Sequence, residues 1–389
     1  MQPQLCAQNQ RTQRTQTATY QRRRPETSAL YQLIQKHLQS FTDHLAEHSG
    51  ATLPKYVREE FEGILLCGQL SEGFARVVCR SCQFEHLVGF SCKSRTLCAS
   101  CVARRMADTV FHLTHHVLPE NVPYRQWTIS FPFALRRRLA RDKQLFTRCV
   151  RLFFRTVFAW QRRQARRLGI AHPIPGGIAV LQFWGSLLQL TPHAHNWIPD
   201  GIFYYQQDGT LAFKPLEPPD DCTLQALADK LYARVAKACA QGDPDDDCAP
   251  ADEDQALLAD FQAEATQGPK RSAAHPFLLD EPGAASSGGL SLHIGLPTPA
   301  GDTKALAHRL GYAMRPPIAT KRLTETPAGK FRLKLRKPLS DGRTVLFFEP
   351  FTLLRNLAAI IAPPGFNLTR YFGILTPTSQ LNNFVGRIE

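Results

Sequence analysis

Two histidines separated by one residue, His193 and His195, lie in a segment of alternating polar and apolar residues, LQLTPHAHNWIPDG. Because alternate residues of a β-strand point to the same face, both imidazoles can reach one metal ion while Ala194 faces the fold interior. A divalent ion held in this way can polarise a phosphodiester. Such a pair is also found as a purely structural feature, so its interpretation depends on the other motifs of the chain.

The cysteines are clustered in a way that indicates a metal site. Six of the eleven lie between Cys67 and Cys101, and in a cytosolic protein clustered cysteines favour metal binding over disulfides. Two CxxC pairs in this stretch have the spacing of a zinc ribbon, in which four thiolates hold a tetrahedral zinc ion. The predicted ligands of this structural zinc are Cys79, Cys82, Cys98 and Cys101. Three residues remain as substitute ligands or as ordinary buried or surface side chains: Cys67, Cys92 and His86.

A tyrosine in a basic setting is the candidate nucleophile. Tyr312 lies in TKALAHRLGYAM, between Arg309 and Arg315, and two prolines follow. A neutral phenol is a poor nucleophile, but a metal ion and cationic side chains lower the cost of charge on the phenolate and on the phosphorane. Tyr371, in TRYFGIL, is a second candidate on the same grounds, and a core position on an amphipathic helix is the alternative for Tyr312.

The net charge of +14 is concentrated in one segment. From Arg136 to Arg167 there are twelve Lys or Arg residues and a single acid, Asp142. So basic a stripe favours a polyanionic partner, and nucleic acid is the usual one; a solvated helix face is the alternative. The predicted DNA-binding residues are Arg136, Arg137, Arg138, Arg162, Arg163, Arg166, Arg167 and Arg315.

Hydrophobic periodicity predicts an α+β protein. The residues 1–27 are rich in Gln, Thr and Arg and are expected to be a disordered basic tail. From Asp243 to Glu264 there are nine acids and no Lys or Arg, and we predict an acidic linker or solvated insertion over 243–289. Helices are predicted over Ser28–His48, after Pro54, over Ala103–Val117, Leu135–Leu168 and Thr303–Met314, and from Pro350. Strands are predicted over Tyr124–Phe131, Gly177–Trp184, Leu188–Trp197, Gly201–Tyr205, Leu290–Leu296, Phe331–Arg336 and Thr344–Phe348.

The chain shows no signal for a membrane or for export. No apolar run approaches the roughly 20 residues that a bilayer-spanning helix needs, and the first residues lack the apolar core of a secretory signal. We therefore expect a protein that stays in the cytoplasm of its cell and has no membrane partner.

These motifs, in this order, resemble the rolling-circle transposases of the insertion-sequence-ninety-one type. The resemblance runs from about residue 53 to residue 371, outside the acidic segment. It depends on LLCGQLSEGFARVVCRSCQFEHLVGFSCKSRTLCASCVARRMADT, RQWTISFPFALR, LQFWGSLLQLTPHAHNWIPDG and GYAMRPPIATKRL. It implies a helical lead-in and zinc-ribbon-like domain over 28–120. It also implies an HUH nuclease domain, with a central antiparallel sheet and packed helices, over 121–242 and 290–389.

The resemblance implies roles for individual residues. His193 and His195 would bind the catalytic Mg²⁺ or Mn²⁺, and Tyr312 would attack single-stranded DNA to give a 5′-phosphotyrosyl intermediate. A third metal ligand is expected, for which Gln182 and His293 are the candidates. Some relatives carry a second tyrosine one helical turn earlier, but His308 occupies that place here, so the chain resembles the single-tyrosine branch.

Three functions agree with these observations. The first is a transposase that nicks DNA at an element end and rejoins it to a target. The second is a plasmid or phage replication initiator or relaxase with the same chemistry. The third is a zinc-dependent DNA-binding protein whose nuclease has lapsed. The zinc-ribbon motif, and the lack of a helicase-type GxxxxGK[ST] loop, favour the transposase.

Overall fold

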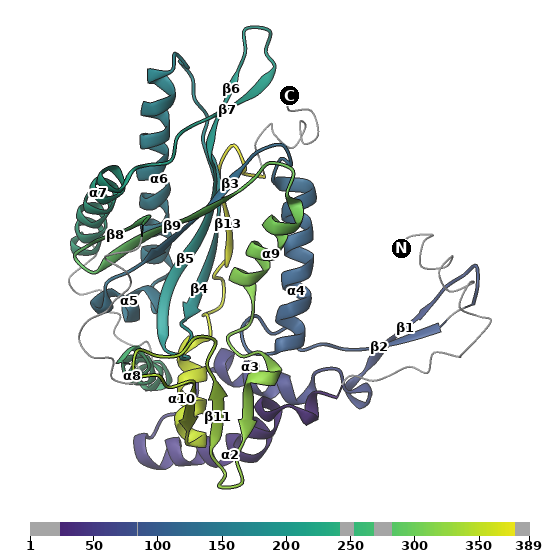
Figure 1. The fold of residues 1–389 in the computed structure, drawn as a ribbon. Coiled ribbons are helices and arrows are strands. Elements are labelled where there is room, and N and C mark those ends of the chain that lie inside the picture. The colour runs from purple at the N-terminus through teal and green to yellow at the C-terminus, as the bar shows by residue number, and fades with distance from the viewer. Residues whose placement is uncertain (1–23, 84, 242–252, 268–281, 378–389) are drawn as a thin grey trace.

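The computed structural model describes residues 24–83, 85–241, 253–267 and 282–377. They form the expected α+β fold, built around a six-stranded sheet (Figure 1). All its strand pairs are antiparallel, and the order is β13-β4-β5-β3-β9-β8. These strands are β3 (Tyr124–Ser130), β4 (Gly176–Trp184), β5 (Leu190–Pro199), β8 (Ala284–Ser287), β9 (Leu290–Thr298) and β13 (Thr369–Gly373).

Three smaller sheets accompany the central one. They pair β1 (Phe74–Val78) with β2 (Glu85–Gly89), β6 (Gly201–Tyr205) with β7 (Leu211–Pro215), and β10 (Leu323–Glu325), β11 (Phe331–Lys334) and β12 (Val345–Phe348) with one another. The α-helices are α2 (Ala29–Ser49), α3 (Lys55–Leu66), α4 (Ala99–His112), α5 (Arg136–Arg141), α6 (Lys143–Arg167), α7 (Asp221–Ala240), α8 (Glu253–Gln267), α9 (Thr303–Met314) and α10 (Pro350–Ile360). A π-helical turn, Leu113–Val117, extends α4.

Helices cover the central sheet on both faces, α6 and α7 on one side and α4 and α9 on the other (Figure 1). The alternation along β5 shows the division. Ala194 belongs to the apolar core shared with α6, whereas Trp197 belongs to a second core shared with α9. His193 and His195 alternate with Ala194 and therefore point to the α9 face.

Local signals explain most helix boundaries. Ser28 accepts a hydrogen bond from the Tyr31 amide and caps α2, and Asp302 caps α9 through the Ala305 amide. An N-cap of this kind satisfies amides that have no partner inside the helix. The helix predicted over Thr303–Met314 is confirmed with the same bounds, and the strands predicted over Gly177–Trp184 and Leu188–Trp197 are confirmed as the antiparallel pair β4 and β5.

The prediction for 243–289 is wrong in part. Helix α8 lies in this acidic stretch and packs against α10 and α5, with Leu258 and Phe261 buried in the core. Strand β8 pairs with the edge of β9. The acids dominate the composition, but apolar residues at helical spacing still give α8 a buried face.

Two further expectations concern the ends and the membrane. Most of the predicted basic tail, residues 1–23, lies outside the described residues, and Pro25–Thr27 forms a short 3₁₀ turn. Within the described ranges, none of the helices is both long and apolar enough to cross a bilayer.

Candidate functional site: a thiolate cluster and a histidine–tyrosine face

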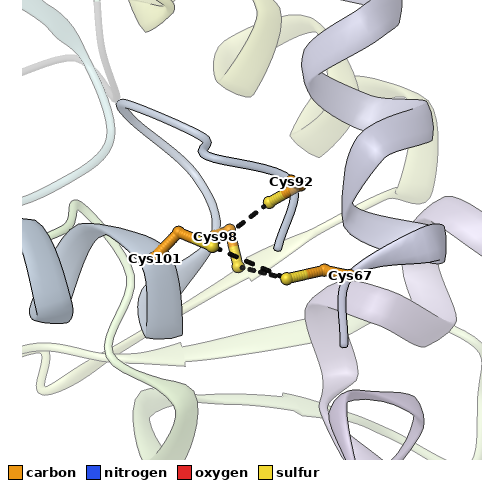
Figure 2. Close-up of side chains that lie close together, drawn as sticks. All are labelled: Cys67, Cys92, Cys98 and Cys101. Carbon is orange, nitrogen blue, oxygen red and sulfur yellow. Dashed lines mark hydrogen bonds between the residues drawn. The ribbon is translucent and has the colours of Figure 1, made fainter. Parts of the chain in front are cut away.

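Four cysteine sulfurs meet in the N-terminal part of the chain (Figure 2). The Sγ atoms of Cys67, Cys92, Cys98 and Cys101 all lie within 4.8 Å of one another. Three of the separations are 3.5 Å for Cys67–Cys101, 3.4 Å for Cys92–Cys101 and 3.8 Å for Cys98–Cys67. Four thiolates at 2.3 Å from a tetrahedral zinc ion would stand about 3.8 Å apart. The cluster therefore has the size and donor set of a closed structural zinc site.

Three elements bring these sulfurs together. Cys67 ends α3, Cys92 follows β2, and Cys98 and Cys101 lie at the start of α4. The loop before α4 is held by Glu60, whose carboxylate accepts hydrogen bonds from the amides of Thr96 and Leu97 at 3.1 and 3.0 Å. A half-buried carboxylate with backbone donors fixes the loop, so two of the ligands have a defined position before metal arrives.

The thiols influence one another's ionisation. Hydrogen bonds from the neighbouring cysteines hold the pKa of Cys101 far below its usual range. The pKa of Cys67 is lowered to about 7, with hydrogen bonds from Cys92 and Cys98 outweighing the opposite effects of Cys101 and of burial. A thiolate is the form that binds zinc. Hydrogen bonds within the cluster, first of all with Cys101, raise the pKa values of Cys92 and Cys98, so metal binding would have to displace the protons of these two thiols.

The ligand set differs from the one predicted from spacing. Cys98 and Cys101 are in the cluster, but Cys79 and Cys82 are not; Cys67 and Cys92 take their places. Cys79 and Cys82 lie between the two strands of the β1–β2 hairpin, which extends away from α3 and α4 (Figure 1). His86, on β2, is likewise outside the cluster. The regular CxxC spacing pointed to the hairpin, whereas the fold brings in two isolated cysteines.

His193 is arranged for metal binding. Its Nδ1 donates to the carbonyl of Thr191 at 2.7 Å. A carbonyl only accepts, so the proton of the neutral ring is on Nδ1 and the lone pair is on Nε2. Burial lowers the pKa of His193, and nearby Arg136 lowers it further. Neutral imidazole is the form that ligates a metal.

His195 has a similar environment. Its Nδ1 lies 2.9 Å from Nε2 of Gln126 and 3.2 Å from Oγ1 of Thr128, both on β3. As placed, the Gln126 amide can only donate to Nδ1, which puts the proton of the neutral ring on Nε2. A metal on Nε2 would require the proton on Nδ1, which would then donate to Oγ1 of Thr128 and, with the Gln126 amide turned over, to its Oε1. Burial holds the pKa of His195 well below its usual range. Gln126 was missed in the sequence, where nothing marks it except its place in a predicted strand.

The two candidates for a third ligand are differently placed. Gln182 is the direct cross-strand neighbour of His193. His293 faces Thr128, which in turn faces His195, so His293 is two strands away from His195. Because strands are about 4.8 Å apart, this separation is close to 10 Å at the backbone. Position in the sheet favours Gln182, although its Nε2 donates to the carbonyl of Ala313.

Tyr312 lies near the C-terminal end of α9 and is half exposed, at 52%. The guanidinium carbon of Arg315 stands 3.7 Å from the centre of its ring, and that of Arg336 stands 5.5 Å away. Burial lowers the pKa values of Arg322 and Arg336, and the charge interaction with Tyr312 opposes the shift in both. Three arginines thus surround this phenol.

Two of these arginines have side-chain N–H donors without a hydrogen-bond acceptor among the described residues. Nη1 of Arg315 and Nη2 of Arg322 are buried and have no acceptor among the residues the structure describes. A buried donor without an acceptor is costly, and anionic oxygens suit it best. Arg322 and Arg336 were not among the predicted site residues, although the basic runs KRL and RLKLRK marked their region.

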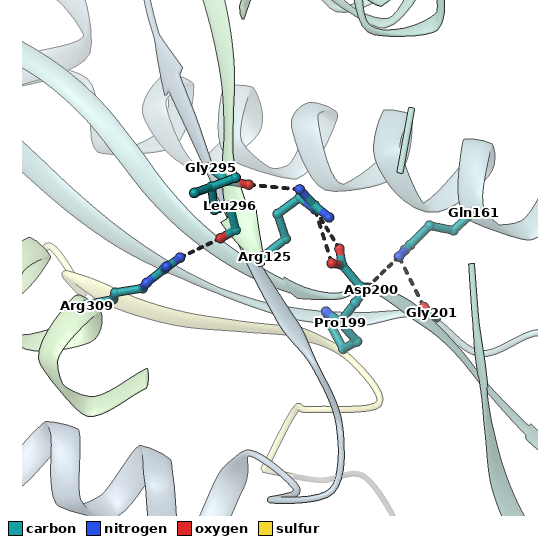
Figure 3. A network of polar contacts seen from close by, with 8 residues as sticks. All are labelled: Arg125, Gln161, Pro199, Asp200, Gly201, Gly295, Leu296 and Arg309. Carbon is teal, nitrogen blue, oxygen red and sulfur yellow. Dashed lines mark hydrogen bonds and ion pairs between the residues drawn. The ribbon is translucent and has the colours of Figure 1, made fainter. Parts of the chain in front are cut away.

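The helix that carries Tyr312 is attached to the sheet by two hydrogen bonds in its C-terminal half. The Gln182 amide donates to the carbonyl of Ala313, next to the tyrosine. One helical turn earlier, Arg309 donates to the carbonyl of Leu296 on β9 (Figure 3). These two bonds fix α9 over the face that carries the histidines.

A buried ion pair supports the same edge of the sheet. Arg125 pairs with Asp200 at 2.9 Å and donates to the carbonyl of Gly295, also at 2.9 Å (Figure 3). Gln161 of α6 donates to the carbonyls of Pro199 and Gly201 on either side of Asp200. The ends of β3, β5 and β9 near Arg309 are therefore held together by this ion pair and these hydrogen bonds.

Tyr371 is less suited to attack a phosphodiester. It lies on β13, paired with Ile178 of β4, and packs against the apolar core beneath α9. Burial raises its pKa, which disfavours the phenolate.

The predicted DNA-binding arginines are divided among different surfaces. Arg136 is buried beside His193 and Arg315 lies on Tyr312, so both belong to the histidine–tyrosine face. Arg138 donates to the carbonyl of Cys239 near the end of α7. The exposed remainder lie on α5 and α6, away from the α9 face of the sheet: Arg137, Arg162, Arg163, Arg166 and Arg167. The stripe is real, but most of it is separated from Tyr312 by the sheet.

Comparison with known families assigns the cysteine cluster and the histidine–tyrosine face to two different family matches. Residues 33–131 match the family described as "Transposase zinc-binding domain", and residues 176–382 match the family described as "Putative transposase". No similar protein was found among curated proteins or solved structures. The first match contains the cysteine cluster; the second contains His193, His195 and Tyr312 and spans more than half of the chain. The chain therefore belongs to this transposase family and is a transposase of the insertion-sequence-ninety-one type with an N-terminal zinc-binding domain.

Proposed function

We propose that this transposase nicks and rejoins single-stranded DNA through a 5′-phosphotyrosine on Tyr312, with Mg²⁺ or Mn²⁺ held by His193 and His195. One arrangement carries the proposal. The two histidines lie on one face of β5, and the helix that bears Tyr312 is hydrogen-bonded to the neighbouring strand directly beside them.

The reaction is an exchange of one phosphodiester for another. The Oη atom of Tyr312 forms a bond to phosphorus while the bond from phosphorus to O3′ breaks, and O3′ leaves with a proton. The strand that follows the nick is then joined to Tyr312 by its 5′ phosphate, and the preceding strand ends in a 3′-OH. Because the bond energy is kept in the phosphotyrosine, a 3′-OH at a target can attack it and release the tyrosine without a nucleotide cofactor.

The residues around Tyr312 supply the electrostatic part of catalysis. Arg315, Arg322 and Arg336 bring three positive charges to the phenol, where negative charge develops in the transition state. The bound divalent ion would polarise the phosphate oxygens. Gln182 is our candidate for a further ligand. The zinc of the cysteine cluster would have no open position, so its role is to build the domain.

The partners follow from this chemistry. The substrates are single-stranded DNA at an element end and at a target, which places the reaction at the nucleoid in the bacterial cytoplasm. His308, exposed on α9 one turn before Tyr312, stands where a second tyrosine would. With Tyr312 as the single tyrosine nucleophile, each chain forms one phosphotyrosine per cycle. A 3′-OH of the DNA then attacks that phosphotyrosine and completes the transfer.

A covalent-adduct assay tests the proposal. Purified protein is incubated with labelled single-stranded DNA carrying an element end and Mn²⁺, and the products are separated on a denaturing gel. We expect a protein–DNA adduct that is lost in Tyr312→Phe and in His193→Ala and is retained in Tyr371→Phe. If all variants bind DNA and keep zinc but the native protein forms no adduct, the DNA-binding protein with a lapsed nuclease is correct instead. Mobilisation of a donor sequence into new sites, as opposed to replication of a circle, distinguishes the transposase from a replication initiator.

A further inference from the structure

The small sheet formed by β10, β11 and β12 has one buried and one exposed face. Its buried side chains belong to the core that includes α2 and α10: Leu323, Phe331, Leu333, Leu346 and Phe348. The other face carries Arg332 and Lys334 on β11 and Phe347 on β12, all exposed. The Phe347 side chain is 59% exposed, so its ring is accessible to a base that could stack on it.

The exposed side chains are neighbours across the strands. Arg332 faces Phe347 directly, and Lys334 faces Val345. On its other side, Arg332 faces Thr324 of β10 and donates to its hydroxyl at 3.3 Å. Directly opposed residues have their Cβ atoms about 5 Å apart. A cation and an aromatic ring therefore lie side by side, the pairing that binds a phosphate and an adjacent base in single-stranded nucleic acid.

The surrounding charge is strongly positive. From Arg315 to Arg343 there are nine Lys or Arg residues and two acids. Both acids are paired, Glu325 with Lys36 and Asp341 with Arg343. Among the described residues, neither Arg332 nor Lys334 forms an ion pair, so both charges are available to an anionic partner.

The basic face leads to the tyrosine. Arg332 and Lys334 alternate with buried residues along β11 and therefore point to the same face, and Arg336 follows two residues beyond the end of the strand, also exposed. Arg336 stands beside the ring of Tyr312, and Nε of Arg322 donates to the carbonyl of Lys334 at 2.7 Å. The line of cations therefore ends at the phenol.

We propose that the exposed face of β10–β12 binds single-stranded DNA next to the phosphodiester that Tyr312 attacks. Arg332, Lys334 and Arg336 contact successive phosphates, and a base stacks on Phe347. This inference rests on the proposed function, because it assigns the path by which that substrate reaches the tyrosine.

The test measures affinity separately from cleavage. Binding of a labelled oligo-dT strand is followed by fluorescence anisotropy at a series of salt concentrations, with native protein and the double variant Arg332→Gln/Lys334→Gln. We expect weaker binding and a log–log salt slope that is smaller by about 1.4, since each single-strand phosphate contact contributes about 0.7. The matched control is Lys230→Gln/Lys237→Gln on α7, which removes the same charge from exposed positions distant from this sheet. It should keep the native slope.

The aromatic contact is tested by Phe347→Ala, which should weaken oligo-dT binding roughly 5- to 150-fold, while Phe347→Tyr restores it. Zinc content and circular dichroism identify any variant that fails to fold; Arg332→Gln alone then replaces the double variant. Native affinity and slope in the folded Arg332 and Phe347 variants would overturn the proposal. So would an equal loss of affinity for duplex DNA, because the stacking contact requires an unpaired base.

The two proposals fail separately. Adduct formation at saturating DNA reports on Tyr312 and the histidines, and it should survive in Phe347→Ala. An adduct that persists in Tyr312→Phe would disprove the proposed nucleophile, and the sheet would then not lead to the reacting phosphate. Loss of oligo-dT binding without loss of the adduct at saturation supports both.

Discussion

The side-chain amide of Gln182 donates to the carbonyl of Ala313 and so joins the strand beside His193 to the helix of Tyr312. The metal-binding face and the nucleophile are therefore held in one hydrogen-bonded unit, although they lie more than a hundred residues apart. A rigid support of this kind is what a strand-exchange site needs, because the tyrosine must meet the same phosphate twice.

The zinc ligands can be assigned by mutation. Cys92→Ser should lose the bound zinc and lower the free energy of unfolding by more than about 4 kcal/mol, since the metal supplies folding energy at a closed site. Cys79→Ser should keep the metal of the cluster, and Cys222→Ser, at an exposed position, is the control. Metal content by mass spectrometry and urea titration measure both effects. Zinc that is lost from Cys79→Ser and kept in Cys92→Ser would restore the ribbon arrangement.

Gln126 should act through His195. Gln126→Ala removes the Oε1 acceptor that would hold the Nδ1 proton of metal-bound His195, and should weaken Mn²⁺ binding about 10- to 100-fold, the usual effect of losing an outer partner. The Mn²⁺ concentration that gives half-maximal adduct formation measures this, with DNA saturating. Gln144→Ala, exposed on α6, is the control. An unchanged Mn²⁺ requirement in Gln126→Ala would show that the contact is only structural.

Arg336 should matter more for rate than for stability. Arg336→Gln removes a charge beside Tyr312 and should slow adduct formation on the order of 100-fold at saturating DNA, as loss of a transition-state donor does. The free energy of unfolding should change by less than about 0.5 kcal/mol, because the side chain is exposed. Lys337→Gln is the neighbouring control and should react at close to the native rate. Equal rates for the two variants would remove Arg336 from the site.

The buried histidines predict a pH dependence of stability. Burial holds the pKa of His195 in the native protein well below 6.5. As pH falls through 6.5, this histidine therefore binds a proton in the unfolded chain but not in the native state. Stability is thus present above this pH and lost below it, by about 1 kcal/mol for this residue between pH 7.5 and 5.5. Urea titrations without added Mg²⁺ or Mn²⁺ should show a shallower pH dependence in His195→Gln than in native protein. His308→Gln, at an exposed position, should match the native curve; a native curve from His195→Gln would contradict the shift.

The sequence predicted local features well and tertiary ones less well. Helix α9 was placed correctly because two prolines follow Arg315 and end the helix; the structure adds that Asp302 caps its start. The same alternation that predicted β5 also predicted which face bears His193. The neighbours of that face, such as Gln126, depend on strand pairings that no local pattern encodes.

Two features were missed for definite physical reasons. Regular CxxC spacing favoured Cys79 and Cys82, whereas Cys67 reaches the cluster only because α3 packs against the loop before α4. Helix α8 was hidden by its acids, although Leu258 and Phe261 give it a buried side.

Identification of the modified peptide tests the central claim most directly. The adduct formed with Mn²⁺ is digested with nuclease and trypsin, and the peptide that retains a nucleotide is sequenced by mass spectrometry. Because trypsin does not cleave before proline, the peptide of Tyr312 begins at Leu310 and ends at Lys321, while that of Tyr371 begins at Tyr371. We predict a 5′-phosphonucleotide on Tyr312 within the first peptide. A nucleotide on Tyr371, on another residue, or joined through a 3′ phosphate would contradict the proposed reaction.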